Sequence, residues 1–336
     1  MMKNHPLSGY AAVLLGTVFL TTGSLDADEP FAPKLFAFQN GVHFSTPNKR
    51  IEVLKELGYD GIGSANLNDL RSRWAEYRKQ GLKIYSIYSG VTIQNDRFTV
   101  PPKLLQAIGD LKGTDTVVEL FVGGKGSDEQ AVMAVREVAA AAEKSMLKIV
   151  LYPHSGCHID HVADAVRIAR KVDRKNVGVM FNLCHFLMVE PDSDLEKELR
   201  AAKPWLWRVS ICGAETGTRS FSTLIQPLDR GDFPQLDLLK LLREQDFRGP
   251  IGLQCYGVKG DARQNLQHSV NEWKKLMSEL QRFPQQRLPA TPKPRRTKPK
   301  SWPSGQKGHA TEKNSDRSIM PVLPAILMAH SYGAIA

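Results

Sequence analysis

Short apolar runs alternate with amphipathic segments from Lys34 to Leu280, and this alternation constrains the fold more than any other feature. Eight apolar runs occur, and a helix-length segment follows each of them. The runs are apolar throughout, which is typical of parallel strands buried between layers of helices. Eight strand–helix units in roughly 250 residues predict a (β/α)8 barrel, the TIM barrel, over residues 34–280.

The individual elements can be placed from their apolar pattern and from the Pro and Gly residues that flank them. The expected strands are 35–38, 61–63, 83–88, 116–122, 148–152, 177–181, 207–211 and 251–254, and the expected helices are 47–57, 67–79, 102–111, 128–144, 158–172, 192–202, 235–245 and 261–280. A doubly wound open sheet is the alternative fold. The turn after the first strand, Gln39-Asn40-Gly41, speaks against it, because it lacks the glycine pattern of a dinucleotide phosphate loop.

The N-terminal residues have the pattern of an export signal. Lys3 precedes an apolar core of residues 11–20, and small or polar residues follow to about residue 27. An apolar core of this length is short for a membrane span. We therefore expect residues 1–27 to be a cleaved signal peptide and the protein to be exported to the periplasm or the extracellular space, with a retained anchor as the alternative.

The net charge of +10 is concentrated at the C-terminus. Residues 281–336 hold ten Lys or Arg and two acidic residues, so this segment contributes +8 and the remainder is close to neutral. Its richness in Pro, Gln and basic residues predicts a disordered tail. The near-neutral barrel gives no sign of specific nucleic-acid binding, whereas the tail would allow weak contact with polyanions.

Four cysteines occur, and no CxxC pair is among them, so a thiolate zinc site is not expected. They are Cys157, Cys184, Cys212 and Cys255. Three of them lie near the ends of expected strands. In an exported protein, a disulfide between neighbouring strand ends and isolated buried thiols are both compatible with this pattern.

Several expected strands end at polar side chains, and in a barrel the C-terminal ends of the strands meet at one mouth. His154 and His185 follow adjacent strands, so they are the candidate acid–base pair. A shared metal ion or a purely structural role for each histidine are the alternatives. The candidate substrate-binding residues are Gln39, Tyr88, Glu119, Tyr152, Asn182, Ser210 and Gln254.

Three segments resemble the xylose-isomerase-like barrels, a superfamily of sugar isomerases, epimerases and relatives such as AP endonuclease family 2. They are residues 51–61 (IEVLKELGYDG), residues 176–185 (NVGVMFNLCH), and residues 227–233 (PLDRGDF) with 249–254 (GPIGLQ). The resemblance covers residues 35–280. It implies a TIM barrel that acts on a carbohydrate at its C-terminal mouth.

The resemblance also implies a divalent metal, which members usually hold with Glu, Asp, His and Glu from the last four strands. At the matching positions this chain has Tyr152, Asn182, Ser210 and Gln254. All four side chains are neutral, and amides bring no charge to a hard cation. We therefore expect no carboxylate metal site and assign no metal ligand, although His185 matches the second histidine of the family.

Two functions remain open at this point. In the first, the protein is an exported sugar isomerase, epimerase or lyase that moves protons through His154 and His185. In the second, catalysis is lost and the mouth is a carbohydrate-binding pocket, because Asn, Gln, Tyr and His side chains suit sugar hydroxyls.

Overall fold

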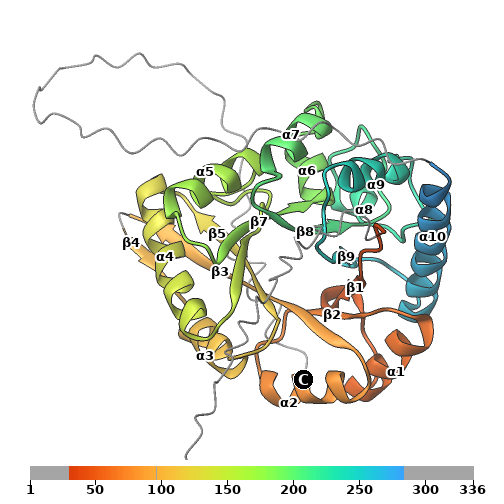
Figure 1. Cartoon of the computed structure of the whole chain (residues 1–336), viewed down its shortest axis with the longest axis horizontal. Coiled ribbons are helices and arrows are strands. Elements are labelled where there is room, and N and C mark those ends of the chain that lie inside the picture. The colour runs from red at the N-terminus through yellow and green to blue at the C-terminus, as the bar shows by residue number, and fades with distance from the viewer. Residues whose placement is uncertain (1–29, 96, 284–336) are drawn as a thin grey trace, which may run out of the picture. The chain divides into compact units, whose positions relative to one another are not determined.

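The computed structural model describes residues 30–95 and 97–283, and within them eight parallel strands close into a ring (Figure 1). Each strand pairs with the next around the ring, β2 pairs with β3, and β9 pairs with β1. The strands are β1 Leu35–Phe38, β2 Gly61–Ser64, β3 Lys83–Gln94, β5 Val117–Gly124, β6 Lys148–Leu151, β7 Val177–Asn182, β8 Leu206–Ile211 and β9 Ile251–Leu253. The predicted barrel is confirmed and the open sheet is wrong.

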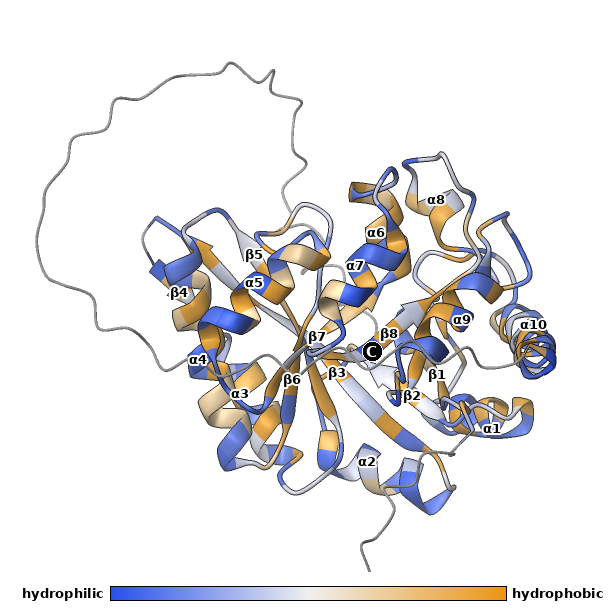
Figure 2. Ribbon diagram, turned by 45° about the horizontal axis from the view of Figure 1, so that its top comes forward, coloured by the Kyte–Doolittle hydropathy of each residue, from blue (hydrophilic) through white to orange (hydrophobic). Residues whose placement is uncertain are grey.

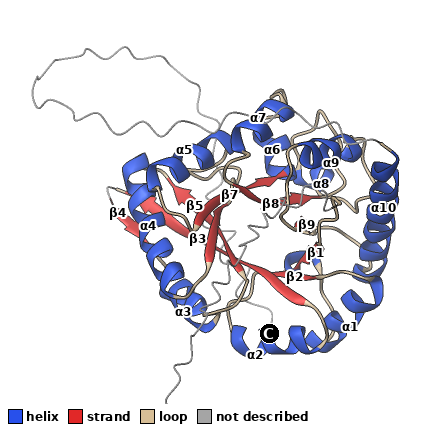
Figure 3. Ribbon diagram, in the orientation of Figure 1, coloured by secondary structure: helices blue, strands red, loops and turns tan. Residues whose placement is uncertain are grey.

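Helices surround this ring (Figure 3). They are α1 Pro47–Leu57, α2 Leu70–Lys79, α3 Pro102–Asp110, α4 Asp128–Lys144, α5 Val162–Val172, α6 Leu183–Val189, α7 Leu195–Ala202, α8 Phe221–Leu224, α9 Gln235–Glu244 and α10 Ala262–Arg282, with a 3-10 turn, η1, at Gln39–Gly41. In the described part of the chain, none of these helices is both long and apolar enough to cross a membrane. The expected signal peptide and all but the first residues of the basic tail lie outside the described residues.

Local sequence signals explain where the well-predicted helices begin and end. Gly58 follows α1 at a φ of 87°, a left-handed conformation that glycine adopts without steric cost. Ser127 precedes α4, where its side chain accepts from the backbone of Gln130, and the Gln130 side chain accepts from the backbone of Ser127. This capping box satisfies two backbone donors at the start of the helix.

Three parts of the structure differ from the sequence prediction, namely the β3–β4 hairpin, α6 and α8, and α8 lies where no element was expected. Strand β3 is 12 residues long and pairs with an added antiparallel strand, β4 Arg97–Thr99, through Thr92, Ile93 and Gln94. Helix α6 begins directly at the end of β7, where a loop was expected, and Asn182 provides no side-chain cap. An apolar helix that continues from an apolar strand without a loop or cap leaves no boundary in the hydropathy pattern.

The apolar core has two layers, and apolar residues are concentrated along the strands in Figure 2. The larger layer lies between the strands and the helices. The smaller one contains side chains from different strands of the ring, namely Phe36, Phe38, Val117, Val150, Tyr152 and Met180. Its aromatic members continue toward the C-terminal ends of the strands, so the same layer supports the mouth.

Glu119 of β5 is a buried carboxyl group among these apolar side chains. It is 0% exposed. Burial raises its pKa from an ordinary value of 4.5 to about 7, although Ser86 and the buried Arg208 partly offset this effect. The barrel therefore holds a carboxyl group that takes up a proton on folding near neutral pH.

We predict that Glu119 makes the stability of the barrel depend on pH. Between about pH 4.5 and 7 the folded chain keeps a proton that the unfolded chain has released, so the free energy of unfolding falls as the pH rises. Between pH 4.5 and 7, the free energy of unfolding of the wild type should fall by about 3 kcal/mol relative to that of Glu119→Gln.

Urea unfolding at pH 5, 6, 7 and 8 measures this difference. The same substitution at the exposed Glu137 of α4 is the matched control. A wild-type-to-variant difference that stays constant with pH would contradict the assignment of a raised pKa to Glu119.

Candidate active site

A pocket opens at the C-terminal ends of the strands. Side chains and backbone from widely separated segments line it: Phe38, Gln39, Asn40, Gly63, Ala65, Tyr88, Tyr152, His154, His185, Phe221, Ile225, Gln254 and Tyr256. Six of the nine predicted site residues are in this lining. They are Gln39, Tyr88, Tyr152, His154, His185 and Gln254.

His154 and His185 lie against each other in the pocket. His154 is in the loop after β6, His185 is in the first turn of α6, and their ring centroids are 4.1 Å apart. Burial lowers the pKa of both rings, and the neighbouring His154 lowers that of His185 further. Both imidazoles are therefore neutral near pH 7, the form in which one nitrogen donates and the other accepts.

Aromatic rings surround the histidine pair. Tyr152 and Phe221 each meet the His185 ring edge-on, at centroid distances of 5.7 and 5.2 Å, and Phe121 lies 6.0 Å from His154. Tyr88 in turn packs 5.0 Å from Tyr152. These contacts remove water from most of the imidazole surface, which is the physical origin of the lowered pKa values.

Hydrogen bonds connect Tyr152 with Asn182 and Gln254. The Tyr152 hydroxyl oxygen accepts from the amide nitrogens of Asn182 and Gln254. The Gln254 side-chain oxygen accepts from the backbone N–H groups of Cys255 and Tyr256, both at 3.1 Å, and the thiol of Cys184 donates to Asn182 Oδ1. Both amide oxygens are thus already engaged.

Three predicted site residues are not part of the pocket wall. Asn182 is buried and reaches the pocket only through Tyr152, whereas Ser210 and Glu119 are 0% exposed within β8 and β5. Asn182 and Ser210 are register partners on adjacent strands. The sequence indicated that these strands end near the site, but it did not indicate how far each side chain lies below the rim.

Other lining residues were missed by the sequence analysis. Phe221 and Ile225 come from α8 and its C-terminal end, between the expected strand 207–211 and the expected helix 235–245, where no element was expected. Tyr256 follows β9 in a turn. Aromatic residues in a loop after a barrel strand were the available signal, because such loops build the site in this fold.

Gln39 connects the pocket to a cation. Its side-chain oxygen accepts from Ser64 Oγ and from Arg73 Nη2, both at 3.0 Å. Burial lowers the pKa of Arg73, but the guanidinium stays charged. These two hydrogen bonds fix the oxygen of the Gln39 amide group, and the amide nitrogen therefore lies on the side away from Ser64 and Arg73.

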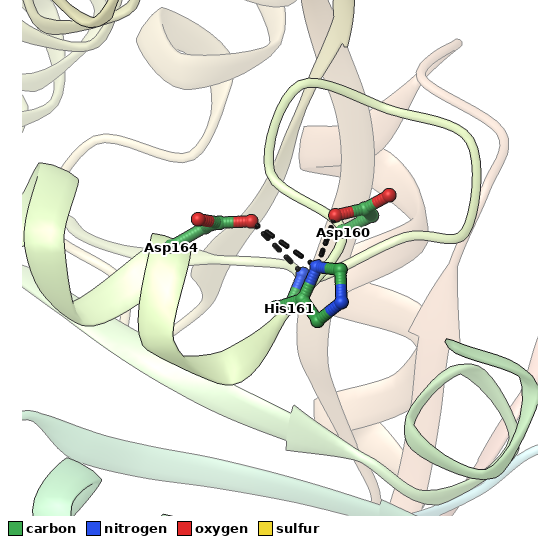
Figure 4. Close-up of side chains that lie close together, drawn as sticks. All are labelled: Asp160, His161 and Asp164. Carbon is green, nitrogen blue, oxygen red and sulfur yellow. Dashed lines mark hydrogen bonds and ion pairs between the residues drawn. The ribbon is translucent and has the colours of Figure 1, made fainter. Parts of the chain in front are cut away.

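Asp160, His161 and Asp164 form a second group of potential metal ligands (Figure 4). One ligand atom from each residue lies within 4.8 Å of the others, at the start of α5. Partial burial opposes protonation of His161, but the hydrogen bond and charge of Asp160 prevail and raise its pKa. The two carboxylates thus favour the imidazolium form of His161, and Asp164 also pairs with Arg167.

All four cysteines are free thiols. Cys184, Cys212 and Cys255 are buried, and burial raises the pKa of the Cys255 thiol to about 12. No disulfide joins the four cysteines in the structure, and the thiol of Cys212 lies beside that of Cys184. The choice between isolated thiols and a strand-end disulfide stays a prediction. Protonated thiols are poor nucleophiles.

Comparison with known proteins identifies the family. The family model described as xylose isomerase-like TIM barrel matches residues 103–276, and no curated protein sequence matches the chain. Among solved structures, the chain is similar to the IolI protein with a bound zinc atom, at 18% identity and a TM-score of 0.61, over 74% of this chain and 99% of that one.

Two further solved structures share the fold. A probable 3-DHS dehydratase, AsbF of Bacillus anthracis, is 14% identical over 72% of this chain and 98% of that one, with a TM-score of 0.58. The 3-keto-D-glucoside 4-epimerase YcjR of E. coli is 15% identical over 73% and 100%, with a TM-score of 0.57. At these identities the likeness is one of fold. The chain belongs to the xylose isomerase-like TIM barrel family.

Proposed function

We propose that this protein is an exported sugar isomerase, epimerase or lyase in which His154 and His185 transfer protons without the divalent metal of the family. The observation that carries this proposal is the pair of neutral imidazoles, 4.1 Å apart, in the pocket at the mouth of the barrel. Neutral histidines can accept and donate protons at neutral pH, which is what the conversion of one sugar into another requires.

The donor atoms of the pocket support a reaction without a hard cation. No carboxylate belongs to the lining in the described part of the chain. The oxygens of Gln254 and Asn182 are turned to backbone N–H groups and to a thiol, and their NH2 groups face Tyr152. Mg²⁺ and Mn²⁺ need oxygen ligands, preferably charged ones, so these residues do not fit either of these hard cations.

The aromatic and neutral polar groups of the pocket suit a carbohydrate. Aromatic faces from Phe38, Tyr88 and Phe221 can pack against the apolar face of a sugar ring, and the two histidines and Gln39 offer polar groups to its hydroxyls. The 3-keto-D-glucoside 4-epimerase of similar fold favours this substrate class. Export remains part of the proposal on the pattern of residues 1–27 alone.

We predict that proton exchange at a sugar carbon adjacent to a carbonyl survives removal of metal. Wild-type protein treated with a chelator is incubated with a panel of ketoses and aldoses in D2O, and incorporation of deuterium is followed by NMR. Exchange should persist after chelation. Loss of exchange that Mn²⁺ or Zn²⁺ restores would contradict the metal-independent reaction.

His154→Ala and His185→Ala should each lower the exchange rate by about 100- to 10,000-fold, the usual contribution of a general acid or base. Sugar binding, measured by thermal shift, should persist in both variants, and His43→Ala at an exposed position is the control. Exchange that both variants retain at the wild-type rate would exclude the pair as proton carriers. Binding by the wild type without any exchange would identify a carbohydrate-binding barrel instead.

A further inference from the structure

Ser155 makes a backbone hydrogen bond to each of the two histidines. Its N–H donates to Nδ1 of His185 at 3.2 Å, and its carbonyl oxygen lies 3.0 Å from Nδ1 of His154. An amide N–H can only donate, so Nδ1 of His185 carries a lone pair. A carbonyl oxygen can only accept, so Nδ1 of His154 carries the hydrogen.

The two rings therefore take opposite tautomers when both are neutral. His154 has its lone pair on Nε2, and His185 has its hydrogen on Nε2. Both rings line the pocket, and among the described residues no hydrogen bond occupies Nε2 of either ring. One proton acceptor and one hydrogen-bond donor are thus available to a bound molecule.

A tight turn holds the two peptide groups in place. Cys157 N–H donates to the carbonyl of His154 at 3.0 Å, and His154 N–H donates to Ile159 at 3.0 Å. Gly156, the third residue of the turn, has a φ of 78°. Glycine is needed for this conformation, which sets the orientation of the peptide that carries the Ser155 carbonyl.

We propose that the backbone of Ser155 fixes His154 as the single base and His185 as the hydrogen-bond donor of an aldose–ketose isomerisation. This inference rests on the proposed function and narrows it. An epimerisation through two bases needs an acceptor on each face of the carbon, and this pair offers one acceptor. The positioning residue is Ser155, and it acts through its main chain.

The proposed reaction balances with these two groups alone. The C–H bond beside the carbonyl breaks, the proton goes to Nε2 of His154, and the electron pair forms an enediolate. The enediolate oxygen accepts the hydrogen bond from Nε2 of His185. The imidazolium of His154 then returns the proton to the neighbouring carbon while the hydroxyl proton moves between the two oxygens, so no oxidant or reductant is consumed.

The tautomers can be measured without any substrate. Full-length protein with 15N-labelled histidine is studied by long-range 1H–15N NMR at pH 8, and His154→Gln and His185→Gln assign the signals. We expect protonated Nδ1 in His154 and protonated Nε2 in His185. Identical tautomers, the reverse assignment, or averaging between tautomers at either ring would overturn the proposal.

A backbone variant tests the role of the turn. Gly156→Ala should change the tautomer population of His154, because alanine disfavours a φ of 78°, although its methyl group would contact nothing. Gly81→Ala is matched, with the same φ of 78° and open space, but it lies at the other end of the barrel before β3. Ser155→Ala should keep both tautomers, because the side chain takes no part.

The tautomer measurement and the deuterium-exchange assay together test the tautomer assignment separately from the proposed function. Opposite tautomers without deuterium exchange in any sugar would keep the assignment and refute the enzymatic function. Exchange with identical tautomers would keep the function and refute the assignment. A sugar that reacts can also be labelled with deuterium on the reacting carbon. Transfer of this deuterium to the neighbouring carbon supports a single base. Complete loss of the deuterium to solvent, with inversion at the labelled carbon, contradicts a single base.

Discussion

Closure of the parallel ring is the constraint on which the rest of this structure depends. Pairing of β2 with β3 and of β9 with β1 forces every strand of the ring to end at the same rim. Residues more than 200 positions apart, such as Gln39 and Gln254, then line one pocket. The ring also creates an apolar interior that lowers the pKa of the histidines and raises that of Glu119.

The side chains of Tyr152, Asn182 and Gln254 form a self-consistent hydrogen-bonded arrangement. Where the family resemblance implies carboxylates, the chain has a phenol and two amides that hydrogen-bond to one another. Unpaired carboxylates packed together without a cation would repel each other and lose solvation, whereas these neutral groups satisfy their neighbours. A neutral rim in turn leaves the imidazoles uncharged, because no acidic neighbour in the described pocket lining stabilises an imidazolium.

Much of the fold could be predicted from the sequence, since its signals are local. The limits of α4 are set by Ser127 and by apolar residues at helical spacing, and β1 is a short apolar run with a clear end. The start of α6 could not be predicted, because no cap, Gly or Pro separates it from β7. The β3–β4 hairpin had only a weak signal, Asn95 directly after β3. Those boundaries depend on packing against the ring.

The candidate site could be predicted in part for the same reason. The positions of His154 and His185 at adjacent strand ends follow from topology, and so does their proximity. Their tautomers could not be predicted, because these depend on the orientation of two peptide groups in the turn of Ser155. Glu119 and Ser210 were predicted to bind substrate, but both lie buried within their strands and outside the pocket lining. Depth along a strand depends on barrel geometry that the sequence pattern does not contain.

A reaction without a hard cation requires that the amide oxygens of Asn182 and Gln254 are turned away from any metal ion. Anomalous diffraction from crystals grown in millimolar manganese tests this directly. We expect no manganese peak among Tyr152, His154, Asn182, His185 and Gln254. A manganese ion ligated there by an amide oxygen and an imidazole would contradict it.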